Sequence, residues 1–91
     1  MGNDAKGRVG LRTLVLGGYG NFGARICRAL ASDPAIQLVI GGRDLQRAQS
    51  LASELGPNVV GIAVDLEAQE FSNTLHQLGI ELLIHAAGPF Q

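Results

Sequence analysis

A glycine-rich turn near the start of the chain has the spacing of a phosphate-binding loop. Its glycines follow the pattern G-x-G-x-x-G, after a short apolar run and before a segment with helical spacing. Glycines at these places permit a tight turn, let a diphosphate approach the backbone, and let the helix pack closely on the strand. Amide groups at the start of the helix can then donate to the phosphates. A purely structural glycine turn is the alternative. The predicted dinucleotide contacts in this loop are Gly18, Tyr19, Gly20, Asn21, Phe22 and Gly23.

The residues at the end of the second apolar run indicate which of the two nicotinamide dinucleotides the chain prefers. NAD sites end this strand with Asp or Glu, whose carboxylate accepts hydrogen bonds from the adenosine ribose. Here the run ends in Gly41 and Gly42, and Arg43 follows. A guanidinium can bind a 2′-phosphate through two hydrogen bonds, and the missing carboxylate removes a repulsion. We therefore favour NADP(H) over NAD(H). The alternative is an exposed Arg43 with Asp44 binding the ribose.

Three further positions follow the third and fourth predicted strands. Asp65 ends the third strand, where it either accepts from the adenine amino group or caps a helix. The small residues Ala87 and Gly88 follow the fourth strand and leave room for the ribose on the nicotinamide side. His85 precedes them, and we interpret it as a packed or supporting residue rather than a catalytic base. We predict no catalytic residue in this chain.

These positions depend on an alternation of apolar runs and amphipathic segments. Short apolar runs of strand length alternate with segments whose apolar residues recur at helical spacing. Asp44 is a suitable N-cap, and glycines at 56 and 79 are expected stops. The predicted elements are strand 12–16, helix 22–32, strand 36–40, helix 45–55, strand 59–64, helix 67–78 and strand 80–85.

This alternation predicts an α/β fold of the Rossmann type, with a parallel sheet between two helical layers. Right-handed crossovers give the strand order 3-2-1-4, with the binding crevice between strands 1 and 4. Such a sheet is the first half of a doubly wound domain, so we expect a fragment of a longer chain. Residues 1–11 are expected to form a flexible arm, and residues 12–91 the nucleotide-binding domain. The apolar edge at Leu82, Leu83 and Ile84 predicts self-association.

Composition excludes several other classes. The 91 residues are 46% hydrophobic and 16% charged, which argues against disorder. No apolar run reaches the roughly 20 residues that cross a bilayer, and no signal peptide is present, so we expect a cytoplasmic protein without membrane contact. All seven basic residues lie in positions 1–47 with three acidic ones, too few for a nucleic-acid surface. Cys27 is the only cysteine, so no cysteine-based metal site forms, and we predict that it is buried.

Three segments together resemble the NADP-binding domain of saccharopine dehydrogenase-like proteins. They are 14–23 (LVLGGYGNFG), 42–45 (GRDL) and 85–91 (HAAGPFQ), and the resemblance extends over nearly all of residues 12–91. It implies an NAD(P)-dependent oxidoreductase whose substrate domain and catalytic residues lie downstream. The nucleotide contacts that it implies are Gly18, Gly20, Asn21, Phe22, Arg43 and Gly88.

Two other functions compete with this one. Nucleotide-sensing domains attached to channels and transporters have similar glycine loops, but they end strand 2 with an acid. A non-catalytic NADP-binding regulator or a short-chain dehydrogenase relative is the other possibility. The short-chain enzymes use a Tyr-x-x-x-Lys pair, whereas Tyr19 and Lys6 are the only residues of those types here. That catalysis therefore cannot occur within these 91 residues.

Overall fold

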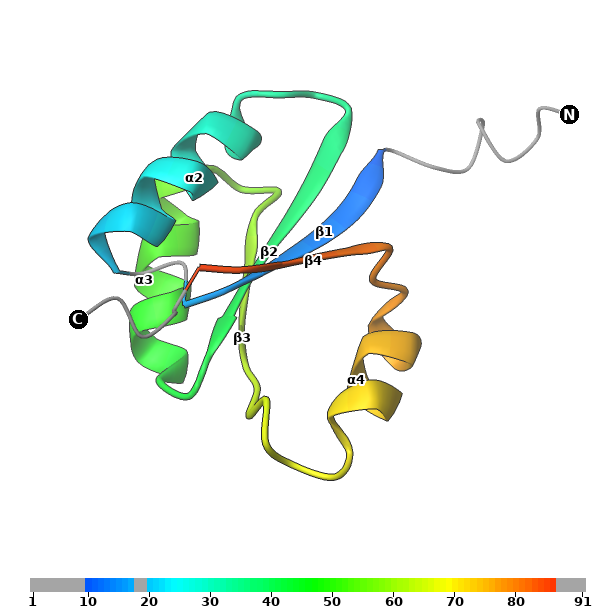
Figure 1. The fold of residues 1–91 in the computed structure, drawn as a ribbon. Helices are drawn as coiled ribbons and strands as arrows, with labels where there is room; N and C mark the ends of the chain where they lie inside the picture. The colour runs from blue at the N-terminus through cyan, green and yellow to red at the C-terminus, as the bar shows by residue number, and fades with distance from the viewer. Residues whose placement is uncertain (1–9, 18–19, 87–91) are drawn as a thin grey trace, which may run out of the picture.

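The computed structural model describes residues 10–17 and 20–86 and shows strands and helices in strict alternation (Figure 1). Near-continuous apolar runs form the strands, and the segments with helical spacing form the helices, as their periodicities predict. The elements are β1 (Leu11–Leu16), α2 (Asn21–Ala31), β2 (Ile36–Gly42), α3 (Leu45–Leu55), β3 (Val60–Ala63), α4 (Phe71–Leu78) and β4 (Leu82–His85).

The four strands form one parallel sheet in the order β3-β2-β1-β4, which confirms the predicted topology. β1 lies between β2 and β4, with Leu14 opposite Val39 on one side and opposite Leu83 on the other. β2 in turn pairs with β3. All four strands therefore run in one direction, and their carboxyl ends meet at one edge of the sheet.

Helices cover both faces of this sheet (Figure 1). On one face, α2 and α3 pack on a cluster that includes the fully buried Val15 and Ile40. On the other face, Phe71 and Leu75 of α4 pack against a cluster that includes Leu14. The molecule thus has the predicted three layers, helix, sheet and helix.

Cys27 lies inside the first of these clusters. Its side chain is fully buried, which confirms the sequence prediction. Burial raises the pKa of the thiol to about 11, because the thiolate would lose its hydration. Cys27 is therefore a small core residue whose thiol keeps its proton at neutral pH.

The predicted caps are correct for α3 and α4. The Asp44 carboxylate accepts from the amide of Arg47 at the start of α3 (3.2 Å). Gly56 follows α3 with a φ of 146°, and Gly79 follows α4 in the left-handed region with a φ of 70°. An L side chain rarely adopts these angles, so glycine is suited to both stops.

The predicted helix 67–78 is wrong at its start, because α4 begins only at Phe71. The amide of Glu67 donates to the Asp65 carboxylate (3.0 Å), and the amide of Ala68 donates to the Asp65 carbonyl oxygen (3.0 Å). This side-chain bond gives the backbone a turn in place of a helix. The strands also differ from the predicted bounds: β1 starts at Leu11, inside the expected arm, while β3 and β4 are shorter than predicted.

Among the described residues, no helix is long and apolar enough to cross a membrane. The same part of the chain contains no group of three or more potential metal-ligating side chains.

Candidate functional site

The carboxyl ends of the strands are held together by hydrogen bonds that continue the sheet beyond the strands. The amide of Gly17 donates to the carbonyl oxygen of Gly41 (2.9 Å), and the amide of Ala86 donates to that of Leu16 (2.9 Å). On the other side of β2, the amide of Val64 donates to the carbonyl oxygen of Gly42 (2.8 Å). The segments that leave the strands therefore start from fixed positions along one edge.

Part of the glycine-rich turn lies at this edge, directly after β1. Gly17 has a φ of 74°, in the left-handed region where glycine avoids the clash of a Cβ. The amide of Gly20 donates back to the Gly17 carbonyl oxygen (3.2 Å), which closes the turn. Among the described residues, a Cβ on Gly20 would have that same oxygen alone within 4 Å, at 3.7 Å, so space remains on that side of the backbone.

α2 begins immediately after this turn. Gly20 is its N-cap, and no side chain caps the helix. The first helical hydrogen bond runs from the amide of Ala24 to the Gly20 carbonyl oxygen (2.7 Å), so the amides of Asn21 and Gly23 have no acceptor in the preceding turn of helix. Together with the positive end of the helix dipole, such amides favour an anion. Gly23 is buried, whereas the large apolar side chain of Phe22 is 59% exposed.

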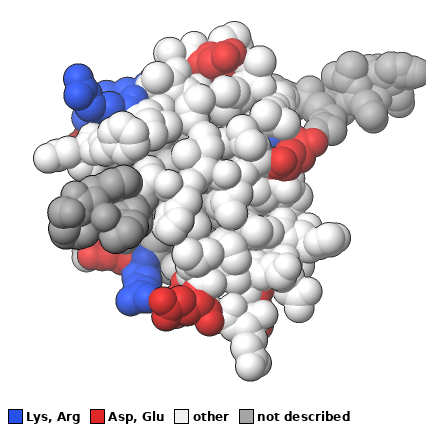
Figure 2. Space-filling model, in the orientation of Figure 1, with Lys and Arg blue, Asp and Glu red and all other residues white. Residues whose placement is uncertain are grey.

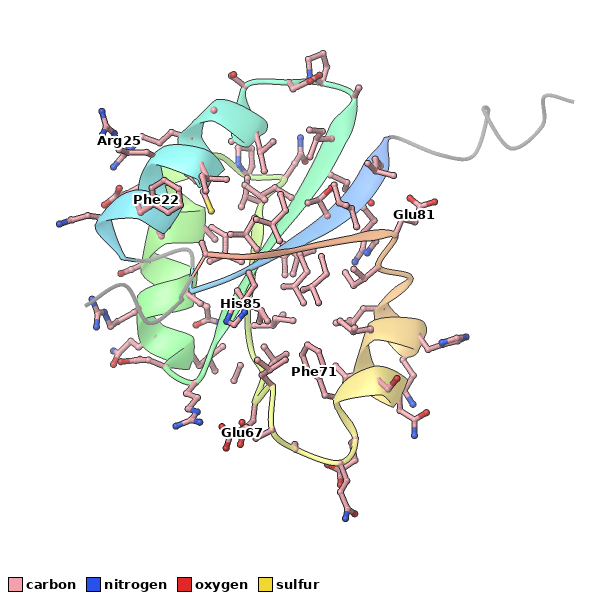
Figure 3. All side chains as sticks on the ribbon, viewed as in Figure 1. Phe22, Arg25, Glu67, Phe71, Glu81 and His85 are labelled. Atoms are coloured by element: carbon pink, nitrogen blue, oxygen red, sulfur yellow. The ribbon has the colours of Figure 1, made fainter. Side chains whose placement is uncertain are left out.

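Arg43 follows β2 and lies next to two carboxylates from the segment after β3. Its Nε lies 3.7 Å from Oδ1 of Asp65, and its Nη2 lies 3.9 Å from Oε1 of Glu67. The Arg43 side chain is 73% exposed, so its guanidinium is at the surface. Figure 2 shows blue and red atoms side by side at the lower margin of this face, where Figure 3 labels Glu67.

A pocket of about 390 Å³ spans the ends of all four strands. Its walls come from the four segments that meet at this edge. They are Leu16, Gly17, Gly42, Arg43, Val64, Leu66, Glu67 and His85. The pocket therefore joins the glycine turn to the end of β2, the place where the sequence predicts a dinucleotide.

His85 is exposed at the end of β4 and borders this pocket (Figure 3). Of the two predicted roles, packed or supporting, the first is therefore wrong for the part of the chain that the structure describes, and the second stays a prediction. β4 is the outer strand on this side of the sheet, so nothing in that part covers the imidazole.

The two aspartates are both engaged by backbone amides. Asp44 caps α3 as described above, so one of its carboxylate oxygens is directed at the helix rather than at the pocket. The alternative that Asp65 caps a helix is wrong, since it closes the turn at residues 65–68 and α4 starts at Phe71. Its contact with Arg43 places Asp65 beside the pocket instead.

Four of the predicted contacts, Gly18, Tyr19, Ala87 and Gly88, lie outside the described residues. The structure brings Gly20, Asn21, Arg43 and Asp65 to the same edge of the sheet, as the alternation of strands and helices requires. The sequence pattern does not single out Glu67, because it predicts a helix at this position. Its signal was its position two residues after Asp65, at the same edge as Arg43.

No protein-family model matches the chain, and no curated protein matches its sequence. Solved structures do match. A short chain dehydrogenase/reductase family protein has a TM-score of 0.73 at 30% identity, over 87% of this chain and 34% of its own. The RhlG/NADP active-site complex of Pseudomonas aeruginosa has a TM-score of 0.71 at 26% identity, over 88% of this chain and 35% of its own. Saccharopine dehydrogenase (L-Glu forming) from Saccharomyces cerevisiae has a TM-score of 0.74 at 23% identity, over 87% of this chain and 17% of its own.

The chain thus spans about a third or less of the length of each of these three proteins. The similarity to saccharopine dehydrogenase shows the fold alone and does not confirm that family. All three comparisons agree on the architecture of the described residues. The chain has the parallel α/β fold of the Rossmann type that these dehydrogenases and reductases share.

Proposed function

We propose that this chain is part of the nucleotide-binding domain of an NAD(P)-dependent oxidoreductase. One observation carries the proposal: α2 starts without a side-chain cap, after a glycine turn whose first residue, Gly17, lines a pocket that spans the strand ends. In open α/β sheets, ligands bind outside the carboxyl ends of the strands, where the strand order reverses. Here the order reverses at β1, which carries the glycine turn.

The diphosphate fits the start of α2. The backbone amides there donate to its oxygens, and the small residues of the turn let it approach closely. The adenosine half then extends toward the end of β2, where Arg43 and Asp65 lie. The predicted contacts at Gly18, Tyr19, Ala87 and Gly88 complete the proposed site from residues outside the described ranges. When bound, the cofactor supplies the hydride chemistry, and the chain binds and orients it.

The preference that we propose is NADP(H) over NAD(H). Two glycines replace the acidic residue at the end of β2, and an exposed guanidinium follows them. An arginine binds a phosphate monoester through charge-assisted hydrogen bonds. The Pseudomonas aeruginosa RhlG complex with NADP, which shares the fold at 26% identity, supports the same cofactor.

The parent protein that we propose is saccharopine dehydrogenase-like, on the basis of residues 85–91 together with the glycine turn. The short-chain dehydrogenase/reductase comparison favours a second parent. A Tyr-x-x-x-Lys pair, which short-chain enzymes use, is absent from the sequence. We therefore assign no catalytic residue to these 91 residues and expect no turnover from the chain by itself.

Titration of the 91-residue chain with NADPH and NADH tests the proposal. We expect tighter binding of NADPH, and we expect Arg43→Ala to weaken NADPH about tenfold through loss of a charge-assisted contact while leaving NADH nearly unchanged. Arg28→Ala is the matched control, since Arg28 is also exposed but lies beside Glu54, away from the pocket lining.

Equal affinities in the unmodified chain, unchanged by Arg43→Ala, would overturn the preference for NADP(H). Absence of binding for both dinucleotides in a folded sample would overturn the nucleotide site itself.

A further inference from the structure

Arg43 is not surrounded by positive charge alone, as a simple phosphate-binding site would be. One guanidinium lies within 4 Å of two carboxylates, those of Asp65 and Glu67. The three side chains are 73%, 50% and 79% exposed, in that order. Because the carboxylates outnumber the cation, the cluster carries a net charge of −1.

The position of Glu67 beside Arg43 follows from the turn after β3. The Asp65 carboxylate binds the amide of Glu67, and the Asp65 carbonyl oxygen binds the amide of Ala68. These two bonds fix the direction in which the chain leaves β3. Glu67 and Arg43 consequently line the same pocket, although they are 24 positions apart in the sequence.

A bound 2′-phosphate would meet both signs of charge at this place. A phosphate monoester carries about −1.5 to −2 charges at neutral pH, so the guanidinium attracts it and each neighbouring carboxylate repels it. The same phosphate must also share the guanidinium with Glu67. The free 2′-hydroxyl of NAD(H) carries no charge and meets neither effect.

We infer that Glu67 is a specificity-determining residue that holds Arg43 and weakens the binding of a 2′-phosphate, so that it limits the discrimination between NADP(H) and NAD(H). The inference rests on the proposed function. Glu67 is the residue to test, because its carboxylate contacts Arg43 without serving the turn. Asp65 does both, so its replacement would also change the backbone.

Dissociation constants of NADPH and NADH, measured for the 91-residue chain and its variants, test this role. Glu67→Gln keeps the shape of the side chain and removes the charge. We expect it to tighten NADPH about three- to tenfold at low salt, where like charges at this range repel most, and to change NADH less than about twofold. The gain should shrink as added salt screens the charges.

Two controls separate this role from a general change of charge or structure. Glu70→Gln removes the same charge from an exposed residue three positions farther on, which makes no ion pair among the described residues. We expect it to leave the ratio of NADPH to NADH affinity unchanged. In an Arg43→Ala background, Glu67→Gln should tighten NADPH less than it does when Arg43 is present, because the competition for the guanidinium is gone.

The outcomes distinguish the inference from the proposed function. Suppose that both dinucleotides bind but that Glu67→Gln changes the ratio of NADPH to NADH affinity no more than Glu70→Gln does. The ion pair between Arg43 and Glu67 is then an ordinary surface contact, and the inference is overturned. An equal change for NADPH and NADH would mark a structural effect and overturn it too. If neither dinucleotide binds to any folded variant, the proposed function fails instead.

Discussion

The central and outer strands of the sheet differ sharply in how the chain covers them. In β1 and β2, runs of four consecutive residues are buried, from Thr13 to Leu16 and from Leu38 to Gly41. No residue of β3 or β4 reaches that degree of burial. Leu82 and Leu83 of β4 remain 42% and 39% exposed, as does Val60 of β3 at 44%.

This difference divides the candidate site between two kinds of support. The glycine turn and Arg43 extend from the two buried central strands, whereas Asp65, Glu67 and His85 extend from the outer ones. The burial of apolar area contributes most to stability, so the central strands fix the phosphate side of the site. The outer strands add charged side chains to that fixed frame.

The largest expected effect comes from shortening one apolar side chain in a central strand and one in an outer strand. The side chain of Ile40 is fully buried, at 0% exposure, so Ile40→Ala leaves a cavity and should lower the free energy of unfolding by about 2–5 kcal/mol. We expect Leu83→Ala to cost less than about 1 kcal/mol, because its side chain is already partly in water. Urea denaturation followed by circular dichroism measures both.

If Ile40→Ala prevents folding altogether, Ile40→Val provides the measurement, with an expected cost of about 0.5–1.5 kcal/mol. Equal costs for the Ile40 and Leu83 variants would show that the two regions are equally packed.

The second test uses the buried thiol of the central region. Burial raises the pKa of Cys27 from 9.0 to about 11, so the folded state holds its proton where the unfolded state has lost it. The stability from this group is complete below pH 9 and is lost as the pH rises through 11, a loss of at most about 3 kcal/mol. Cys27→Ala should remove this part of the alkaline decline. Identical pH profiles for the two chains between pH 8 and 11 would contradict a buried thiol.

The third test concerns a close contact between the outer strand β3 and α3. A Cβ on Gly61 of β3 would lie 2.6 Å from the carbonyl carbon and oxygen of Ala48 in α3. Gly61→Ala should therefore push the helix from the strand and cost about 1–3 kcal/mol. Gly20→Ala is the control, with room for a Cβ and a loss of at most about 1 kcal/mol at the helix cap. Similar costs in thermal unfolding would mean that α3 does not approach β3 so closely.

The smallest expected change in folding comes from a charge on the outer edge. Leu83→Lys should alter the free energy of unfolding by less than about 1 kcal/mol, since the residue is partly exposed. It should nevertheless reduce self-association in sedimentation velocity, because a lysine on an edge strand discourages pairing between chains. Surface Arg28→Lys is the control. A monomeric unmodified chain would refute association through this edge.

The sequence predicts the strand order and the edge that carries the site because both follow from periodicity and the handedness of crossovers. The sequence also predicts Asp44 as a helix cap, since Asp44 immediately precedes an amphipathic segment. It does not predict where α4 starts. Asp65 competes for backbone amides, and the outcome of that competition depends on three-dimensional neighbours that a local pattern does not contain.

For the same reason, the sequence predicts only part of the candidate site. Glycine spacing locates a phosphate loop, and Arg43 stands out because it replaces an expected acid. The ion pair between Arg43 and Glu67 depends on where the turn after β3 leads, and the exposure of His85 depends on what covers β4. Both are properties of the folded arrangement.

The most direct test of the nucleotide site follows backbone amide signals of the isotope-labelled 91-residue chain by NMR as NADPH is added to saturation. The account predicts the largest shifts at Gly17, at residues 20–24 and at residues 42–44, where the strand ends meet the glycine turn. Shifts confined to the opposite end of the sheet, around Pro34 and Asn58, or unmoved signals at residues 20–24, would contradict it.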